Sequence, residues 1–448
     1  MRDVILTLVV VTLIVIALGR PWIGLLTWSW LGYMNPHRFT WGFAYNLPFV
    51  QGSALATVIG LIFSKEPKKL PWSPVVVVWM CWILWTLFTY MFALNEVDAT
   101  NELVRTMKIH LMILVTLVVI NTRERINALV WVMALSIAVF GIKGGIFTLA
   151  TGGKYRVWGP TGSFIEGNNE IALALIMIIP LLRYQQMHTP HRLVRRLLWV
   201  AMAACGLSAL GSYSRGALLA FAAMLGFLWL KSRGKVVLAV PIVAATVLGL
   251  VFMPDAWVER MQTIESYDQD ASALGRINAW HYAVNLAAAR PFTGGGFRSF
   301  TPELFARYAP VPRMFHEAHS IYFEVLGDQG YVGLTIYLLM AILTFKLGSR
   351  IIRQARGDPA RAWAADLAGM LQVSMVGFAV GGAFLGLCYW DLPYQLMAVM
   401  VLTASVVKKS RVATGPAAQG AAVANEQAPA GPAAADLGPK PVLRRFVP

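Results

Sequence analysis

Long apolar stretches alternate with short polar stretches along most of the chain. An α-helix needs about 17 to 25 mainly apolar residues to cross the hydrocarbon core of a bilayer. The pattern therefore predicts an all-α polytopic membrane protein with about twelve transmembrane helices. The expected spans are residues 3–19, 47–63, 72–94, 105–120, 127–150, 169–184, 197–212, 215–230, 236–253, 328–347, 364–384 and 389–407.

Two segments near the N-terminus need separate interpretation. The apolar piece Trp22–Met34 is too short to span easily and is followed by Asn35 and Pro36, so we expect it to be re-entrant or interfacial. If it does span, the N-terminus changes sides. The opening residues Met1–Val10 resemble a signal peptide, but no small-residue cleavage site follows them, and we expect a retained first span.

Composition supports the membrane class. Hydrophobic residues make up 57% of the chain and charged residues 13%, and the mean hydropathy is +0.60. Cys81, Cys205 and Cys388 are widely spaced in or beside predicted spans, so neither a disulfide framework nor a thiolate metal site is indicated. No internal repeat is evident in the sequence.

The pattern divides the chain into four parts. We expect N-terminal transmembrane helices over 1–253 and C-terminal transmembrane helices over 328–411. Between them, residues 254–327 form one large, mainly helical loop that we expect to act as a lid over the membrane surface. Ala, Pro and Gly predominate in residues 412–448, which should form a disordered tail because they cannot bury enough apolar surface to fold.

The positive charges orient the predicted spans. Lysines and arginines collect in cytoplasmic loops, and here they fall in alternate loops. Both termini are then expected in the cytoplasm, and the net charge of +16 is explained by topology and by contact with anionic membrane lipids, without a nucleic-acid partner. The charges are Lys65, Lys68, Lys69, Arg123, Arg125, Arg183, Arg192, Arg195, Arg196, Lys231, Arg233, Lys235, Arg350, Arg353, Arg356, Arg361, Lys408, Lys409 and Arg411.

The segment Arg313–Leu334 joins the large polar loop to an apolar span. His316 and His319 should therefore lie where a water-facing loop meets the membrane. Histidine exchanges a proton near neutral pH, so this junction is a candidate for catalysis. The alternative is a capped helix whose histidines only satisfy hydrogen bonds at the interface.

Arginines on the outer face are unexpected, because positive charge is disfavoured there. Arg215 occupies a very short turn between two apolar spans and should seek an anion. A guanidinium suits phosphate because its planar fork donates two hydrogen bonds and keeps its charge. For any one arginine the alternative is snorkelling to a lipid headgroup. The outer-face arginines are Arg156, Arg215, Arg276, Arg298 and Arg313.

Other charged groups are less specific. Lys143 lies inside an apolar span among glycines, where a charge is costly, and it either pairs with Glu166, Glu170 or a ligand phosphate or forms a structural ion pair. Lys108 and His110 lie just inside the outer end of a helix and are expected to bind substrate or to satisfy polar tips at the interface.

A metal signal is weak in this sequence. Asp268 and Asp270 form a D-x-D pair that could hold a divalent cation, but D-x-D is a weak motif and we expect an acidic turn here. The sequence has no Walker loop, no HExxH and no GxSxG motif, so we expect no cofactor and no metal.

Five motifs then follow one another between about residues 150 and 335. They are GSF-x-x-x-NNE-x-A at 162–172, S-R-G at 214–216, G-R-x-x-x-W at 275–280, the glycine turn at 291–296 and H-S-x-Y-x-x-x-L-G-x-x-G-Y-x-G-L at 319–334. In this order they resemble the O-antigen ligase and polymerase superfamily of bacterial envelope glycosyltransferases. The N-terminal RPWIGLLTWSWLGYMNPHR and the KGG element look like the branch that includes exosortase-associated O-glycosylation ligases.

The resemblance implies a membrane-embedded glycosyltransferase of the inner membrane, with its active site facing the periplasm. An O-antigen ligase of this kind takes glycan from undecaprenyl pyrophosphate and attaches it to a lipid A-core sugar, inverting the anomeric centre without a metal. By position, His319 matches the catalytic base, and Arg215 and Arg276 match the arginines that bind the donor pyrophosphate, with Lys143 as a further candidate. Further candidate substrate contacts are Arg156, Asn168, Asn169, Arg298, Arg313, His316 and Tyr322.

Three other functions stay open at this point. Within the same class the protein could be an O-antigen polymerase or a ligase that glycosylates protein. In a different class it could be a flippase or another transporter of lipid-linked oligosaccharides. A transporter is expected to show charges deep in several helices and repeat symmetry, whereas this sequence shows one deep lysine and gathers its polar residues on one face.

Overall fold

The computed structural model describes residues 1–231, 252–262 and 271–413. In this part of the chain, helices are the only regular secondary structure, so the all-α fold class is confirmed. Most of the span predicted at 236–253 and most of the tail predicted at 412–448 lie outside the described residues, as do Asp268 and Asp270.

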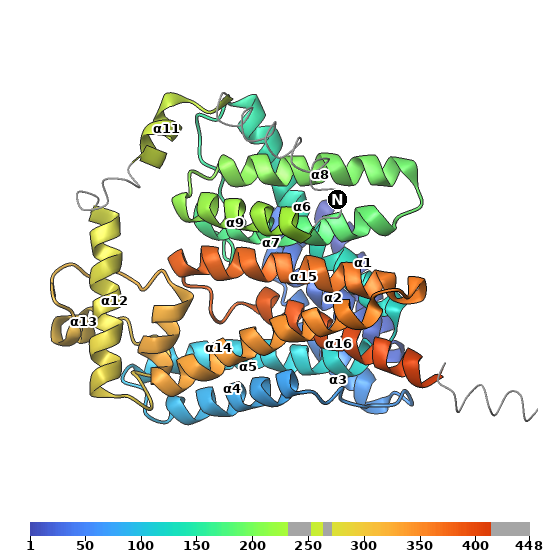
Figure 1. Ribbon diagram of the computed structural model, residues 1–448, viewed down its shortest axis with the longest axis horizontal. Helices are drawn as coiled ribbons and strands as arrows, with labels where there is room; N and C mark the ends of the chain where they lie inside the picture. The colour runs from blue at the N-terminus through green and yellow to red at the C-terminus, as the bar shows by residue number, and fades with distance from the viewer. Residues whose placement is uncertain (232–251, 263–270, 414–448) are drawn as a thin grey trace, which may run out of the picture. The chain divides into compact units, whose positions relative to one another are not determined.

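Every other predicted span coincides with a helix, with ends that differ by several residues. Most of these helices lie side by side in Figure 1. They are α1 (Arg2–Gly19), α3 (Phe49–Phe63), α4 (Pro74–Tyr90), α5 (Glu96–Val119), α6 (Arg123–Ala150), α7 (Asn168–His188), α8 (Arg192–Leu210), α9 (Arg215–Lys231), α14 (Ile321–Ala355), α15 (Ala362–Gly381) and α16 (Asp391–Ala413).

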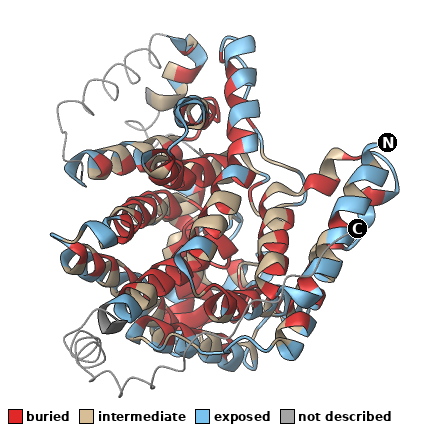
Figure 2. Ribbon diagram, turned by 90° about the vertical axis from the view of Figure 1, so that its right-hand side faces the viewer, coloured by how far each residue is buried: buried red, intermediate tan, exposed pale blue. Residues whose placement is uncertain are grey.

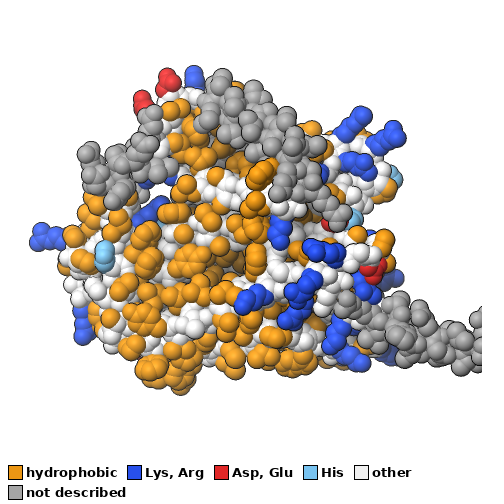
Figure 3. All heavy atoms as spheres, viewed as in Figure 1, with side chains coloured by type: hydrophobic (Ala, Val, Ile, Leu, Met, Phe, Trp, Pro, Cys, Tyr) orange, Lys and Arg blue, Asp and Glu red, His pale blue; other side chains and the backbone are white. Residues whose placement is uncertain are grey.

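Among the described residues, six helical segments are long and apolar enough to cross a membrane. Together with exposed side chains such as Leu55, Leu84 and Val200, they identify an integral membrane protein. Figure 3 shows hydrophobic side chains over the middle of the viewed face and Lys and Arg mainly toward one end. The full number of spans and their sidedness stay predictions. The six segments are Arg2–Gly19, Arg123–Ala150, Asn168–His188, Arg192–Leu210, Ile321–Ala355 and Pro359–Phe384.

The short apolar piece predicted at the interface is a buried helix. It forms α2 (Pro21–Met34), which begins with proline at its first position, where the missing N–H costs nothing. The helix ends at Asn35, whose left-handed backbone (φ 48°) stops it. α2 packs against α1, α3 and α6, so it belongs to the bundle.

One predicted loop is wrong. Residues 95–104, expected as an outward loop, form the first turns of α5. The Asn95 side chain accepts a hydrogen bond from the backbone N–H of Asp98, and Glu96 and Asp98 supply negative charge at the helix N-terminus. Such capping stabilises a helix start, and it outweighs the polar composition that suggested a loop.

Helix α7 lies at the centre of the bundle and is buried along most of its length. It contacts α6, α8, α9 and α15, and Figure 2 shows buried residues concentrated on such inner helices. The glycines of the KGG element (residues 143–145) allow α6 and α8 to approach closely. A Cβ on Gly145 would lie 2.6 Å from the Ala204 carbonyl oxygen on α8. The glycines beside Lys143 therefore admit a neighbouring helix.

The sequence of the large loop predicts helices at 273–289 and 300–308. In its described residues the loop contains three helices: α12 (Ala271–Ala289) and α13 (Pro302–Tyr308), which correspond to these two, and α11 (Asp255–Gln262), which the sequence pattern did not predict. Tyr282, Leu286 and Phe305 form a small core between α12 and α13. α12 contacts α14 and lies across one end of the long helices in Figure 1.

Helix α14 is broken near its start by a glycine. Gly330 has φ 68° and ψ −173°, which is not a helical conformation. The glycine turn at 291–296 fits against this break: the Gly295 N–H donates to the Gly327 carbonyl (2.8 Å), and the Tyr331 N–H donates to the Pro291 carbonyl (2.9 Å). The break frees backbone groups, and the turn satisfies them.

The turn and the break approach so closely that neither has room for a side chain. A Cβ on Gly294 (φ 59°) would lie 2.5 Å from the Gly327 carbonyl oxygen, and one on Gly330 would lie 2.4 Å from the Phe292 carbonyl oxygen. Both positions also need a backbone conformation that other residues adopt only with strain. This contact therefore explains why glycine occupies position 294 in the glycine turn and position 330 in the motif at 319–334.

We predict that Gly294→Ala destabilises the protein by about 2 kcal/mol or more, because it adds left-handed strain to a backbone clash. The measurement is the melting temperature of the purified protein in detergent. Gly226→Ala is the matched control, since a Cβ there meets nothing within 4 Å on helix α9. Equal melting temperatures for both variants would contradict the close contact.

Candidate functional site

A cavity of about 310 Å³ receives residues from six segments of the chain. Its walls come from α5, from the loop before α7, from the segments around Phe300 and His319, from the first turns of α14, and from residues 386–390. His319, the predicted base, is one of the lining residues. A cavity of this size matches a small-molecule or sugar subsite.

His319 has an unusual backbone conformation. Its φ is 40°, in the left-handed region that a residue other than glycine adopts only with strain. The His316 ring meets the His319 ring edge to face, with centroids 4.9 Å apart. Behind His316 lies Gly275, where a Cβ would come within 2.8 Å of the His316 Cδ2 atom. The glycine of the G-R-x-x-x-W motif therefore makes room for the pair of histidines.

Helix α12 holds the histidine segment through two further side chains. The Trp280 indole N–H donates to the Ala318 carbonyl (2.9 Å), and the Trp280 ring stacks on Phe323 with centroids 5.0 Å apart. The Asn278 amide donates to the carbonyls of Val311 and Met314. These contacts hold the chain on both sides of His316 and His319. They give Trp280 of the G-R-x-x-x-W motif a structural role.

The environment of His319 favours its neutral form. Burial lowers the pKa of His319, and the positive charge of Arg276 and the neighbouring His316 lower it further, to about 4. At neutral pH the His319 imidazole therefore holds a lone pair that can accept a proton.

The two predicted pyrophosphate arginines differ in what surrounds them. Arg276 is half-buried on α12 and acts electrostatically on both His319 and Glu170. Arg215 begins α9, directly after a tight turn at Ser212–Ser214. The Asn168 amide donates to the Ser212 carbonyl (2.7 Å), so the NNE motif holds the turn from which Arg215 projects. Neither arginine lines the cavity itself.

Sequence reasoning missed the acidic character of this cavity. Six carboxylates line it, against two arginines. The sequence suggests a role only for Glu166 and Glu170, as partners of Lys143, and among the described residues Lys143 forms no ion pair with either of them. Carboxylates accept hydrogen bonds from hydroxyl groups, which suits a sugar. The six are Glu102, Glu166, Glu170, Glu317, Glu324 and Asp328.

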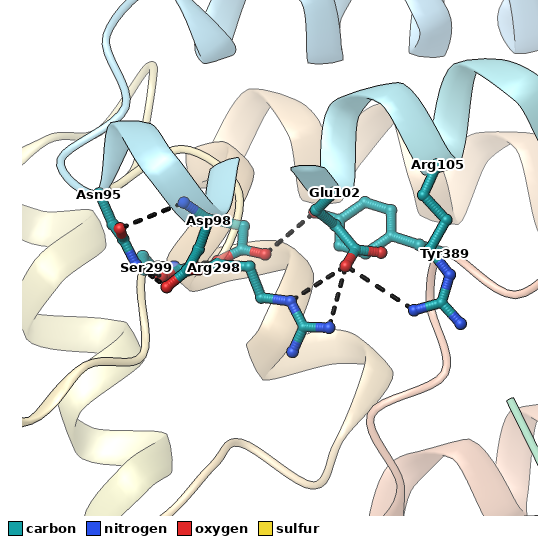
Figure 4. A network of polar contacts seen from close by, with 8 residues as sticks. Asn95, Asp98, Glu102, Arg105, Arg298, Ser299 and Tyr389 are labelled. Carbon is teal, nitrogen blue, oxygen red and sulfur yellow. Dashed lines mark hydrogen bonds and ion pairs between the residues drawn. The ribbon is translucent and has the colours of Figure 1, made fainter. Parts of the chain in front are cut away.

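Glu102 connects the two arginines of the cavity (Figure 4). Its carboxylate accepts from the Arg298 Nε (3.0 Å) and pairs with the Arg298 Nη2 (2.9 Å), and the Arg105 Nη1 lies 3.9 Å away. Glu102 is buried, so this pair is less screened than a surface pair. Arg298, a predicted substrate contact, therefore already forms an ion pair with Glu102.

A second carboxylate anchors the chain next to Arg298. Asp328 accepts hydrogen bonds from the Ser299 backbone N–H (3.1 Å), from the Ser299 hydroxyl (2.8 Å) and from the Tyr389 hydroxyl (3.1 Å). Arg298 itself has φ 56°. The anchor holds this strained residue in the orientation that faces Glu102.

The remaining predicted contacts lie outside the cavity. Lys143 is exposed on α6, 5.7 Å from the Phe39 ring centroid. Arg156 lies 5.9 Å from the Tyr213 ring centroid, and the Tyr322 hydroxyl donates to the Ala379 carbonyl (2.8 Å), which joins α14 to α15. Arg313 is exposed and Asn169 is half-buried. Their roles toward substrate stay predictions.

Comparison with known families divides the chain into two matched regions. The family described as O-antigen ligase matches residues 200–338, which include Arg215, Arg276 and His319. A family of unknown function (DUF5935) matches residues 1–190. Comparison with curated proteins found no match. The resemblance seen in the motifs is thus confirmed where the two arginines and the histidine lie.

We predict that His319 makes stability depend on pH in the acid range. Its folded pKa of about 4 lies below the ordinary value of 6.5, so the unfolded chain binds its proton first. Stability from this group is full above about pH 6.5 and falls as the pH drops toward 4.

Thermal unfolding of His319→Gln should therefore depend less on pH across this range than unfolding of the wild type. His281→Gln is the control, because His281 is exposed on α12. Identical pH profiles for the wild type and His319→Gln would show that burial does not keep His319 neutral.

Proposed function

From the O-antigen ligase domain that this chain carries over residues 200–338, we propose that the protein is an O-antigen ligase. It transfers glycan from undecaprenyl pyrophosphate to a sugar of lipid A-core at the periplasmic face of the bacterial inner membrane. The family match itself supports an enzyme that handles lipid-linked glycan, and the acceptor, the sidedness and the mechanism are parts of the proposal.

One observation supports this proposal above the others. His319 is neutral, strained and lines a sugar-sized cavity, and Arg276 acts on it from the adjacent helix α12. A base and a fixed cation side by side are what inverting transfer from a pyrophosphate needs, because that leaving group requires charge stabilisation more than protonation.

The reaction is a single displacement. The acceptor hydroxyl gives its proton to the His319 imidazole while its oxygen forms a bond to the anomeric carbon of the donor glycan. The bond from that carbon to the pyrophosphate oxygen breaks on the opposite face, which inverts the centre. Arg215 and Arg276 neutralise the charge that grows on the leaving pyrophosphate. His319 then releases its proton to water.

Donor binding should strengthen the base. Arg276 lowers the pKa of His319 in the structure without ligand. A pyrophosphate bound to Arg276 offsets that positive charge, so the pKa of His319 rises toward the working pH. General-base catalysis is most effective when these two values are close. The base would thereby become stronger when the donor is bound.

The acidic cavity suits the glycan and disfavours phosphate. Its six carboxylates can accept hydrogen bonds from sugar hydroxyls, whereas they would repel a pyrophosphate. In the proposed complex the sugar occupies the cavity, and the pyrophosphate lies beside it, toward Arg276. A transporter would not need a neutral base at this junction, and we favour transfer over transport for that reason.

We predict that His319→Ala lowers the rate of glycan transfer by about 100- to 10,000-fold, the usual effect of removing a general base. His316→Ala should have a milder effect, because that ring only packs against His319 in this mechanism. The assay uses purified protein, lipid-linked glycan and lipid A-core, with donor binding measured in parallel. Small and equal losses in both variants would exclude His319 as the base.

We predict that Arg215→Lys and Arg276→Lys each reduce transfer strongly, although the net charge is unchanged. Lysine keeps the charge but loses the two-pronged donation to phosphate. If these side chains only snorkelled to lipid, lysine would replace them almost silently. Arg307→Lys on α13 is the matched control, because Arg307 lies outside the cavity on the exposed surface of the loop. Full turnover in both variants would refute a pyrophosphate site at these arginines.

A further inference from the structure

A second and larger cavity lies in the N-terminal region of the chain. It is a groove of about 950 Å³ between α2, the segment that follows it, α3 and α5, with the loop around Ser163 at one end. All of these elements lie in residues 1–190, outside the O-antigen ligase match.

Several apolar side chains that line the groove are accessible from outside. Leu55 on α3 is 62% exposed, and Val104 and Leu111 on α5 are 45% and 49% exposed. All three line the groove, and α3 and α5 make only weak contact with each other. In a membrane such a surface faces lipid chains, so the groove can receive one laterally.

The groove also carries positive charge among these apolar residues. Three cations line it, Arg38, Arg105 and Lys108, against one carboxylate, Asp391. Lys108 has no hydrogen bond and no ion pair with any described residue. It lies on α5 between Val104 and Leu111 at helical spacing, and an unpaired charge beside apolar side chains is costly unless a ligand or water compensates it.

Aromatic rings hold the two guanidinium groups. The Arg105 guanidinium carbon lies 3.5 Å from the Phe164 ring centroid, and that of Arg38 lies 4.6 Å from the Tyr45 ring centroid. Such stacking fixes a guanidinium plane at little cost in side-chain entropy. The groove thus combines two oriented arginines, one lysine and an apolar channel, which is the chemistry of a phosphorylated lipid.

The groove adjoins the cavity of His319. Arg105, Ser163, Phe164 and Trp390 line both spaces. A headgroup held by the cations of the groove therefore lies next to the space that His319 lines. Arg276 approaches His319 from helix α12, which contributes nothing to the groove.

We infer that the groove binds the acceptor, and that the acceptor is a membrane lipid with phosphate next to its apolar chains. The inference depends on the proposed function, since it assigns the second substrate of that reaction. Lys108, Arg105 and Arg38 bind the lipid phosphate, and Leu55, Val104 and Leu111 contact one lipid chain. The acceptor sugar then extends into the acidic cavity, where its hydroxyl meets His319.

The charge distribution favours the acceptor over the donor in this groove. Donor and acceptor must meet at His319, and each carries phosphate that the acidic cavity cannot hold. Two separate cationic places are therefore needed. If Arg215 and Arg276 take the donor pyrophosphate, the three cations of the groove are left for the second phosphorylated substrate.

The test measures lipid binding to the full-length protein without turnover, by native mass spectrometry. The probes are lipid A, which is a diphosphorylated acylated disaccharide, dephosphorylated lipid A, and undecaprenyl phosphate. Lys108→Gln removes the unpaired charge, and Leu55→Trp fills the apolar channel without changing charge. Lys154→Gln is the matched control, since Lys154 is exposed and lies outside the groove.

We expect Lys108→Gln to weaken lipid A binding by about tenfold or more, the effect of losing a hydrogen bond to a charged group. Leu55→Trp should also weaken lipid A binding. With dephosphorylated lipid A, Lys108→Gln should bind as well as the wild type. Undecaprenyl phosphate should bind the wild type and all variants equally. Unchanged lipid A binding in both groove variants would overturn the inference. Loss of undecaprenyl phosphate binding instead would assign the groove to the donor and overturn it too.

A transfer assay on the same variants, run beside the binding measurement, separates this inference from the proposed function. A wild-type protein that binds lipid A through Lys108 but transfers no glycan to lipid A-core would overturn the proposed function and support the lipid site. A protein that transfers glycan with the groove blocked by Leu55→Trp would support the function and overturn the groove as acceptor site.

Discussion

The contact between the glycine turn at 291–296 and the break in α14 organises the functional region. Backbone meets backbone there, and the hydrogen bonds from Gly295 to Gly327 and from Tyr331 to Pro291 leave no space for a side chain. This contact joins the glycine turn to the first turns of α14, and His319 lies two residues before that helix begins. It also sets the position of Ser299 over Asp328, and so directs Arg298 toward Glu102.

Acidic and basic side chains occupy different places around His319. The cavity that contains the histidine is lined mainly by carboxylates, whereas cations lie at its edges, with Arg276 on helix α12 and Arg105 at the junction with the groove. A sugar and a phosphate therefore favour different places. Such a division suits a transferase that must hold two charged lipids and let only their glycan ends meet.

The two matched regions of the chain share this site. Residues 200–338 provide His319 and the arginines, and residues 1–190 provide Glu102, Arg105 and the loop at Ser163. The N-terminal region is thus part of the wall of the cavity. A family of unknown function and an O-antigen ligase domain meet at one charged network, which Figure 4 shows around Glu102.

The sequence by itself determined the helices and the candidate chemistry. Apolar runs and capping residues act locally, so the positions of the helices and of His319 at a loop–helix junction could be read directly. Only the tertiary structure decided which side chains meet. Glu102 was read as part of a polar loop and proved to be a buried helical partner of Arg298, 196 residues away in the chain. Lys108 became informative only when α3 and α5 were seen to leave a groove beside it. Local sequence patterns do not predict such contacts, because the contacts depend on how helices that are distant in the chain pack together.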